Sequence, residues 1–230
     1  MDEEIVREEQ FRNRLLVEGE DDLHVCIHLL KAHQIKILEK ERSGKNKTVG
    51  KGEIEIVSKG GVERLLAILS EELQGSDLKH LGVLVDADED FTNRWRSLRD
   101  ILVNSGYSTI PSIPHREGTI IKESDKPTVG IWIMPDNQLP GMLEHFCESL
   151  VPTNDPLWAT AGIALHQVIE QDRRFPEKHM IKAHLHTWLA WQEEPGKPVG
   201  QAITKRYLDH QAAHAQQFIQ WIRQLFEAEP

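Results

Sequence analysis

The chain has 230 residues, 39% of them hydrophobic, which suffices for one sizeable α/β domain with an appendage or for two small domains. Its net charge of −10 argues against a protein whose whole surface attracts nucleic acid, and its two distant cysteines indicate neither a disulfide framework nor a zinc cluster. The first ten residues are acidic and lack the apolar segment that a signal peptide contains, and the sequence has no run of about 18 apolar residues that could cross a membrane. We therefore expect a cytoplasmic protein without membrane contact.

The first predicted unit is a strand, a glycine turn and a helix. Residues 15–17 are apolar and stop at Glu18 and Gly19. Asp21 and Asp22 then precede an apolar helical stripe, and negative charge of this kind is typical of the first turn of a helix. We therefore expect Glu18 at the carboxyl end of the first strand.

The most basic stretch of the chain, residues 40–52, is poor in apolar residues and is predicted to be an exposed loop. A solvated loop is the favoured interpretation, because runs of charge usually are solvated. The alternative is a loop that grips phosphate beside an acidic metal site. The cationic side chains of this stretch are Lys40, Arg42, Lys45, Lys47 and Lys51.

A strand at residues 53–58 and a helix at 60–73 lead to a run of five mostly apolar residues at 81–85. This run has no alternation, which predicts a strand buried on both faces. It stops at Asp86, Asp88, Glu89 and Asp90, where ligands collect in open α/β sheets.

The acids at the end of this strand repel one another, and a bound cation would relieve that repulsion. In an extended segment the side chains of Asp86 and Asp88 would point the same way and could hold one divalent ion. The alternative is that such acids only cap helices, as Asp21, Asp22 and Asp90 can.

The following elements complete the sheet. We expect a helix at 91–106, an edge hairpin around 119–121, and a last strand at 128–137 that is followed by a helix. Alternating strands and helices predict an α/β fold with a mostly parallel sheet of about four core strands and helices on both faces. Arg94, Arg96 and Arg99 are expected to solvate the outer face of the helix.

From residue 154 onward the strand pattern disappears. Three helices are predicted at 155–171, 178–192 and 214–228, with a loop at 193–200 where proline and glycine recur. We therefore divide the chain into an α/β domain at 1–150 and a helical cap or extension at 151–230.

The ordered pair of motifs LLVEGEDD and LVDADED looks like the Toprim domain of topoisomerases, primases, recombination-repair proteins and overcoming-lysogenization-defect nucleases. This resemblance covers roughly residues 11–150. The stretches LVEGEDD, VDADED, IMPDNQLPGMLE and KAHLHTWLAWQEEPGKP are also similar to a family of stand-alone Toprim-like proteins, over most of the chain. The resemblance implies a Toprim/Rossmann-like fold.

The resemblance also implies roles for particular residues. Glu18 matches the Toprim glutamate, Asp86 and Asp88 match its metal-holding aspartates, and Asp22 matches a further acidic position. The cofactor would be Mg²⁺ or Mn²⁺, which prefer hard oxygen ligands. Glu18 would be a metal ligand or a general acid or base with a raised pKa.

Three further candidates come from the same resemblance. Asp136 and Glu144 match a stretch that helps to hold a second metal in the lysogenization-defect nucleases. Lys182 is a candidate catalytic residue, since nucleases of this kind can use a lysine to offset charge in the transition state. Nothing in the sequence places Lys182 near the acids, and an ordinary exposed helical lysine is the favoured interpretation.

Two functions stay open at this point. One is a metal-dependent nuclease or phosphotransferase that cleaves nucleic-acid phosphodiesters. The other is a non-catalytic regulatory module that binds a metal or nucleotide and docks a partner protein. The charge of −10 favours the second, unless the chain forms a homodimer in which two basic loops border one groove.

Overall fold

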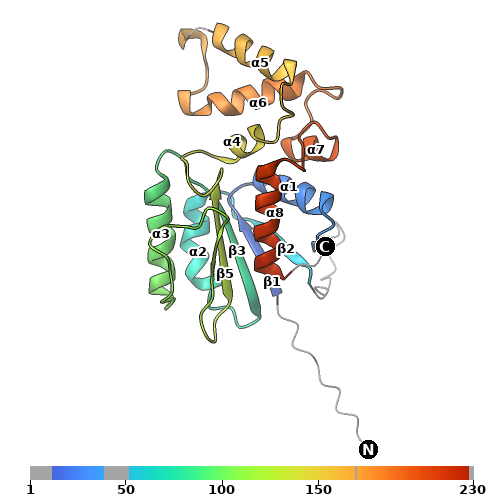
Figure 1. Cartoon of the computed structure of the whole chain (residues 1–230). Coiled ribbons are helices and arrows are strands. Elements are labelled where there is room, and N and C mark those ends of the chain that lie inside the picture. Colours follow the sequence, from blue (N-terminus) through green and yellow to red (C-terminus); the bar gives the residue numbers. More distant parts are fainter. Residues whose placement is uncertain (1–11, 39–51, 169, 228–230) are drawn as a thin grey trace, which may run out of the picture.

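The computed structural model describes residues 12–38, 52–168 and 170–227 (Figure 1). The predicted basic loop at 40–52 lies outside the described residues except for Gly52. Its interpretation as a phosphate-binding or solvated loop therefore stays a prediction.

Within the described residues, five strands form one sheet in the order β2-β1-β3-β5-β4. They are β1 (Arg12–Val17), β2 (Ile54–Ser58), β3 (Leu78–Asp86), β4 (Thr119–Ile121) and β5 (Thr128–Met134). Four strands are parallel, and β4 pairs antiparallel with β5 at one edge. The predicted mostly parallel α/β sheet is thus confirmed.

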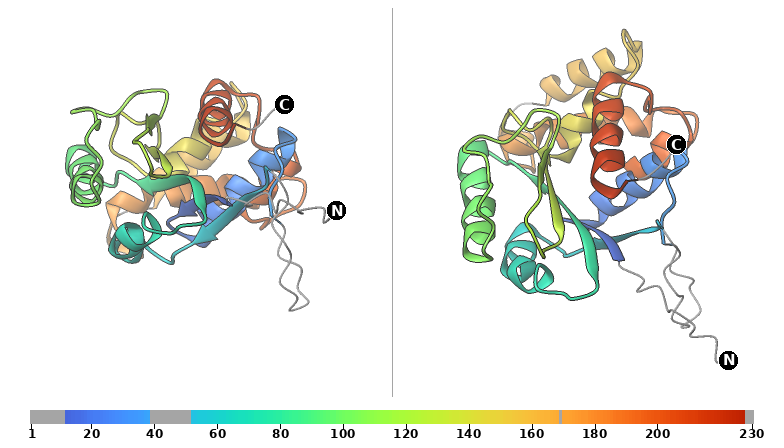
Figure 2. Two further views of the ribbon diagram at one scale, coloured as in Figure 1. Left: turned by 90° about the horizontal axis from the view of Figure 1, so that it is seen from below. Right: turned by 60° about the horizontal axis from the view of Figure 1, so that its bottom comes forward.

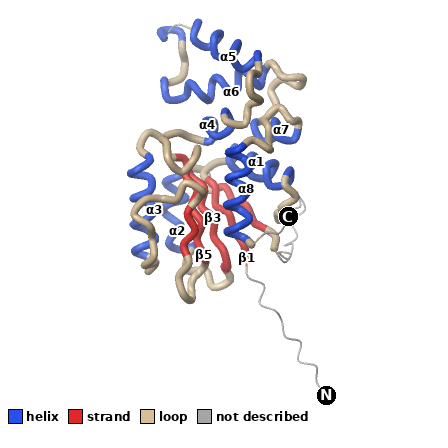
Figure 3. The backbone as a smooth tube through the Cα atoms, viewed as in Figure 1, coloured by secondary structure: helices blue, strands red, loops and turns tan. Residues whose placement is uncertain are grey.

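Helices cover both faces of the sheet, as its unalternating apolar strands require (Figures 2 and 3). One face packs on α2 (Val62–Glu72) and α3 (Phe91–Asn104). The opposite face packs on α1 (Glu20–Ala32) and α8 (Ala213–Phe226). The sheet therefore forms the middle of three layers.

Helix α8 lies along the centre of the sheet in a groove that two glycines create. Gly82 on β3 pairs with Gly130 on β5. A Cβ atom at Gly130 would lie 2.4 Å from Leu225, and one at Gly82 would lie 3.1 Å from Phe226. Helix α8 is thus part of the α/β layers, although the sequence assigned it to the extension from residue 151 onward.

The remaining helices lie beyond the carboxyl ends of the parallel strands or beside α1 (Figure 1). They are α4 (Leu143–Glu148), α5 (Pro156–Gln167), α6 (Met180–Ala190) and α7 (Val199–Thr204), with short 3₁₀ turns at Glu170–Asp172 and Glu177–His179. Helices α5 and α6 pack on each other, and α6 also packs on α4. Among the described residues, no helix is both long and apolar enough to cross a membrane.

The predicted loop at 193–200 is wrong at its end, because α7 begins at Val199. Pro198 precedes the first helical residue, a place where proline costs no hydrogen bond. Gly200 lies inside the helix, and a Cβ atom there would be 2.7 Å from the carbonyl carbon of His24. The glycine that resembled a helix breaker is instead what allows α7 to approach α1.

Candidate functional site

The ends of two neighbouring strands bring together the two acids on which the sequence argument depended most. Glu18 directly follows β1, and Asp86 is the last residue of β3. Because β1 and β3 are parallel neighbours, both acids lie at the same edge of the sheet. The backbone N–H of Asp86 donates a hydrogen bond to Glu18 Oε2 at 3.3 Å.

Asp22 joins these acids from the first turn of α1. Its side chain is buried, and Oδ2 accepts a hydrogen bond from the Gly19 N–H at 3.0 Å. The other oxygen, Oδ1, is buried without a hydrogen-bond donor among the described residues. A buried carboxylate oxygen with no donor is costly, and a bound cation would satisfy it.

Glu144 completes the group from the first turn of α4. It is only 5% exposed. The neighbouring Leu143 N–H donates a hydrogen bond to Asp86 Oδ1 at 2.9 Å, which fixes the start of α4 against the end of β3. We call Glu18, Asp22, Asp86 and Glu144 the acid cluster.

Lys182 contacts the acid cluster, so its interpretation as an ordinary exposed helical lysine is wrong. Its Nζ lies 2.9 Å from Glu144 Oε1 and 3.8 Å from Asp21 Oδ2. The packing of α6 on α4 places the ammonium group there. Burial lowers the pKa of Lys182, but the bond to Glu144 and the charge of Asp21 outweigh it and raise that pKa overall.

Asp88 departs from the predicted geometry, because β3 ends at Asp86 and Asp88 has a φ of 54°. The extended pair expected from the D-x-D spacing is therefore not formed. The Asp88 backbone exchanges two hydrogen bonds of 2.8 Å with Gly141, and its side chain is 52% exposed. Asp88 lies at the rim of the site instead of in the acid cluster.

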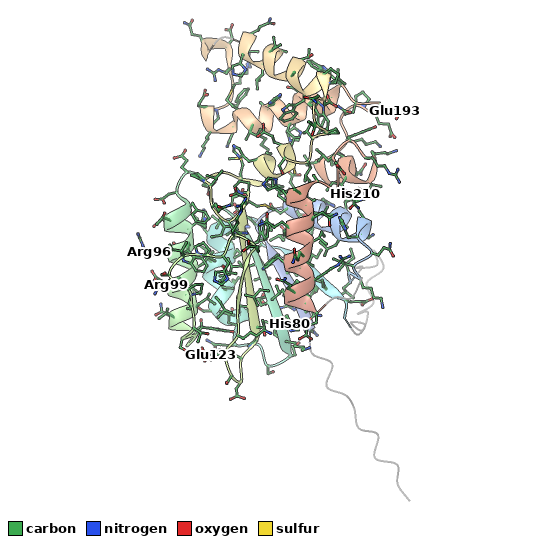
Figure 4. The ribbon with its side chains drawn as sticks, in the orientation of Figure 1. His80, Arg96, Arg99, Glu123, Glu193 and His210 are labelled. Atoms are coloured by element: carbon green, nitrogen blue, oxygen red, sulfur yellow. The ribbon has the colours of Figure 1, made fainter. Side chains whose placement is uncertain are left out.

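Arg94 holds the rim together, a role that the sequence did not suggest. Its Nη2 lies 2.7 Å from Asp88 Oδ2, and its Nε donates to the Asp86 carbonyl at 2.7 Å. Arg96 and Arg99 are exposed on the outer side of α3, as predicted (Figure 4). Only the position of Arg94 in the first turn after the D-x-D motif distinguishes it from them.

Asp136 is not brought into the acid cluster. Its Oδ1 accepts hydrogen bonds from the backbone N–H groups of Gln138 and Leu139, which closes a turn after β5. In the described part of the chain, no hydrogen bond or ion pair joins it to the other acids. Asp90 has the helix-capping role that the sequence suggested, since it accepts from the Asn93 N–H at 2.9 Å.

Burial disfavours the ionised forms of three members of the acid cluster, Glu18, Asp22 and Asp86. Burial, together with the charges of Asp22, Glu18, Glu144 and Asp88, raises the pKa of Asp86 to about 9. Burial and the charges of Glu18 and Glu144 raise the pKa of Asp22 to about 7, although a backbone hydrogen bond opposes this. Burial also raises the pKa of Glu18. A cation bound here would return the carboxylates to their ionised form.

The chemistry of the acid cluster fits a hard divalent cation, since every side chain offers carboxylate oxygen and one oxygen has no donor. The geometry is not preformed: no three His, Cys, Asp or Glu side chains of the described residues are placed to hold a metal ion together. Protein donors already engage Asp86, Asp88 and Glu144. Metal binding would therefore require side chains to change partners.

A cavity of about 930 Å³ opens beside Asp88 and Arg94. Its opposite wall comes from α5, α6 and the 3₁₀ turn at Glu177–His179. No feature of the sequence indicated this cavity, because the cavity depends on how the α5–α6 pair lies over the sheet edge.

Comparison with known proteins places the chain in a family without assigning an activity. Residues 12–227 match the family described as "Protein of unknown function (DUF3226)". No curated protein and no solved structure matches the chain. Because the match spans nearly all of the described chain, the protein belongs to the DUF3226 family.

Proposed function

We propose that this protein is a divalent-cation-dependent phosphotransferase of the Toprim type that cleaves phosphodiesters of nucleic acid. The acid cluster carries this proposal: four acids from separate elements converge where parallel strands end, and Asp22 Oδ1 is buried without a donor. The raised pKa values of Asp22 and Asp86 support a site that binds positive charge.

The residues divide into three roles. Glu18, Asp22 and Asp86 would hold Mg²⁺ or Mn²⁺, with Glu144 and Asp88 as further ligands once they leave Lys182 and Arg94. The cation supplies charge stabilisation of the phosphoryl oxygens and a more acidic bound water. Lys182 and Arg94, released from their acids, would face the phosphate and offset its charge.

Glu18 also suits proton transfer, because burial raises its pKa toward the working range of a general base. In this alternative role Glu18 would not hold the cation but would take a proton from the attacking water, while Asp86 and Asp22 act as ligands. Asp136 has no part in this proposal, because its carboxylate closes a turn.

A non-catalytic regulatory module is the second candidate. The observation that favours it is that Lys182 and Arg94 already neutralise Glu144 and Asp88. Such internal ion pairs would let the fold persist without a metal, and the net charge of −10 opposes unaided binding of a polyanion.

Calorimetric titration with Mn²⁺ and Mg²⁺ tests the proposal on the wild type, Asp86→Asn and Asp136→Asn. Asp136→Asn is the matched control, since asparagine keeps the turn-forming oxygen. We expect Asp86→Asn alone to lose metal binding, and to lose cleavage of labelled single-stranded and duplex DNA or RNA on the same samples.

Metal binding without any cleavage would favour the regulatory module. A wild type that binds neither cation would refute the metal site, and equal loss in Asp136→Asn would refute the assignment of the ligands.

A further inference from the structure

The cavity beside Asp88 shares the rim of the proposed site but has a different chemical character from the acid cluster. Its sheet-side wall includes Asp88, Arg94 and His145, and its helical wall includes Leu165, Ile181 and His184. The two walls belong to the sheet edge and to the α5–α6 pair. Asp88 and Arg94 belong both to this cavity and to the rim of the acid cluster.

The helical wall offers an apolar surface with a fixed ring. Leu165, Met180 and Ile181 supply the apolar part. The ring of His184 stacks on Trp158 with centroids 3.7 Å apart, and its Nε2 lies 2.8 Å from the Trp158 carbonyl oxygen. This wall resembles the surfaces on which proteins stack nucleobases, which include histidine as well as larger aromatic rings.

The two histidines also present complementary hydrogen-bonding atoms. The carbonyl of Trp158 can only accept, so Nε2 of a neutral His184 carries the proton and Nδ1 is left as an acceptor. The Met142 N–H donates to Nδ1 of His145 at 3.2 Å, so Nε2 of that neutral ring carries the proton and is left as a donor. A nucleobase edge carries both kinds of group.

The charges of the cavity separate the two parts of a nucleotide. Asp88, Glu89, Asp90 and Glu177 line it against only Arg94 and Lys178. An uncompensated phosphate is repelled by this excess of acids, whereas a neutral base is not. The phosphate therefore belongs at the rim, over a cation in the acid cluster, and the base belongs in the cavity.

The size of the cavity selects among nucleic acids. A volume of 930 Å³ is near the upper end of the roughly 300–1,000 Å³ of small-ligand pockets. It has room for one or two unstacked nucleotides between its walls, but a paired duplex cannot enter it.

From these observations we infer that the cavity between the D-x-D rim and the α5–α6 pair binds the nucleoside beside the scissile phosphate, so that the substrate is single-stranded nucleic acid. This inference rests on the proposed function and adds a substrate class to it. It also predicts that strand binding requires a divalent cation.

The test measures binding of the full chain to a single-stranded oligodeoxynucleotide that carries fluorescein and phosphorothioate linkages. Binding is detected as an increase in fluorescence anisotropy in the presence of Mn²⁺. Ile181→Trp fills the cavity, and Ile163→Trp adds the same bulk on α5 at a side chain that is 62% exposed. Loss of one base contact predicts about tenfold weaker strand binding for Ile181→Trp, with Ile163→Trp near the wild type.

A second pair of variants avoids any question of folding. Lys178→Glu makes the cavity more acidic, and Arg99→Glu makes the same charge change on the exposed side of α3 (Figure 4). We expect Lys178→Glu to weaken strand binding and Arg99→Glu to leave it nearly unchanged. Calorimetric Mn²⁺ affinity should not fall in any of the four variants.

The outcomes separate this inference from the proposed function. Failure of the wild type to bind Mn²⁺ would remove the proposed function. Normal Mn²⁺ binding with strand affinity unchanged in both Ile181→Trp and Lys178→Glu would remove only the cavity inference. Equal affinity for a duplex would overturn the single-strand assignment. Thymidine monophosphate that displaces the labelled strand as effectively as an unlabelled strand does would overturn it as well, whereas weaker displacement by this nucleotide supports it.

Discussion

At the scale of single residues, the buried acids should make the metal-free protein less stable as pH rises. The folded-state pKa of Asp86 is about 9 and that of Asp22 about 7, both above the ordinary value of 3.8. The folded state thus holds protons that the unfolded state releases. The free energy of unfolding therefore falls as the pH rises from 3.8 through these two folded-state pKa values.

This pH dependence can be measured by thermal unfolding in the presence of a chelator. Asp86→Asn removes the larger contribution, so the melting temperature of this variant should decline less toward pH 9 than that of the wild type. Saturating Mg²⁺ should flatten the wild-type profile but not that of the variant. Parallel profiles for the two proteins would contradict the raised pKa of Asp86.

Arg94 should compete with a cation for Asp88. Arg94→Gln frees the Asp88 carboxylate and removes a positive charge from the rim. The Asp88 side chain of this ion pair is 52% exposed, so the pair contributes at most about 1 kcal/mol. We therefore expect up to about fivefold tighter Mn²⁺ binding by calorimetry. Arg96→Gln is the control on the exposed face of α3. Weaker binding in Arg94→Gln would instead show that its bond to the Asp86 carbonyl is needed.

The sequence alone predicted part of this site. Glu18 and Asp86 followed from where apolar runs stop, because parallel strands end at one edge. Lys182 and Arg94 did not follow, since their roles depend on the packing of α6 on α4 and on the left-handed turn at Asp88. Asp136 was assigned from a motif, whereas its local backbone determines its role.

At the scale of elements, the contact between α1 and α7 is closer than any residue but glycine allows. In Gly200→Ala the new Cβ atom would meet the backbone of His24, which cannot move aside as a side chain can. We expect a loss of about 1–3 kcal/mol in the free energy of unfolding, measured with urea. Gly162→Ala on α5, where the nearest neighbour is the His184 ring at 3.3 Å, should cost less. An equal loss in both variants would contradict this packing argument.

The predicted elements succeeded where hydrophobic pattern and length agreed, as in β3 and α3. They failed at α7 because proline and glycine were interpreted as helix breakers. Pro198 instead precedes the first residue of α7, and Gly200 lets this helix pack on α1. The place of α8 was also beyond sequence reasoning. Its apolar stripe is evident, but only the paired glycines of β3 and β5 show which surface it covers.

At the scale of the whole molecule, one buried cluster joins the sheet to the helical extension. Leu15 of β1, Trp188 of α6 and Trp221 of α8 belong to it, so the chain should unfold in one transition despite its two predicted parts. Trp221→Ala should lower the free energy of unfolding in urea by about 3–5 kcal/mol. Near the urea concentration at the midpoint of its unfolding, this variant should no longer bind metal. Trp191→Ala, at a side chain that is 40% exposed, should have little effect. Two separate transitions in the wild type would contradict a shared core.

The seat of α8 on the central strands also bears on how the chain is made. The ribosome releases Gly82 on the order of ten seconds before Phe226 at ordinary elongation rates. Until α8 is made, the surface at Gly82 and Gly130 that it covers stays open, so we expect the nascent chain to bind chaperones. Because α8 packs on β3, whose last residue is Asp86, we expect the acid cluster to become rigid only after translation has passed Phe226.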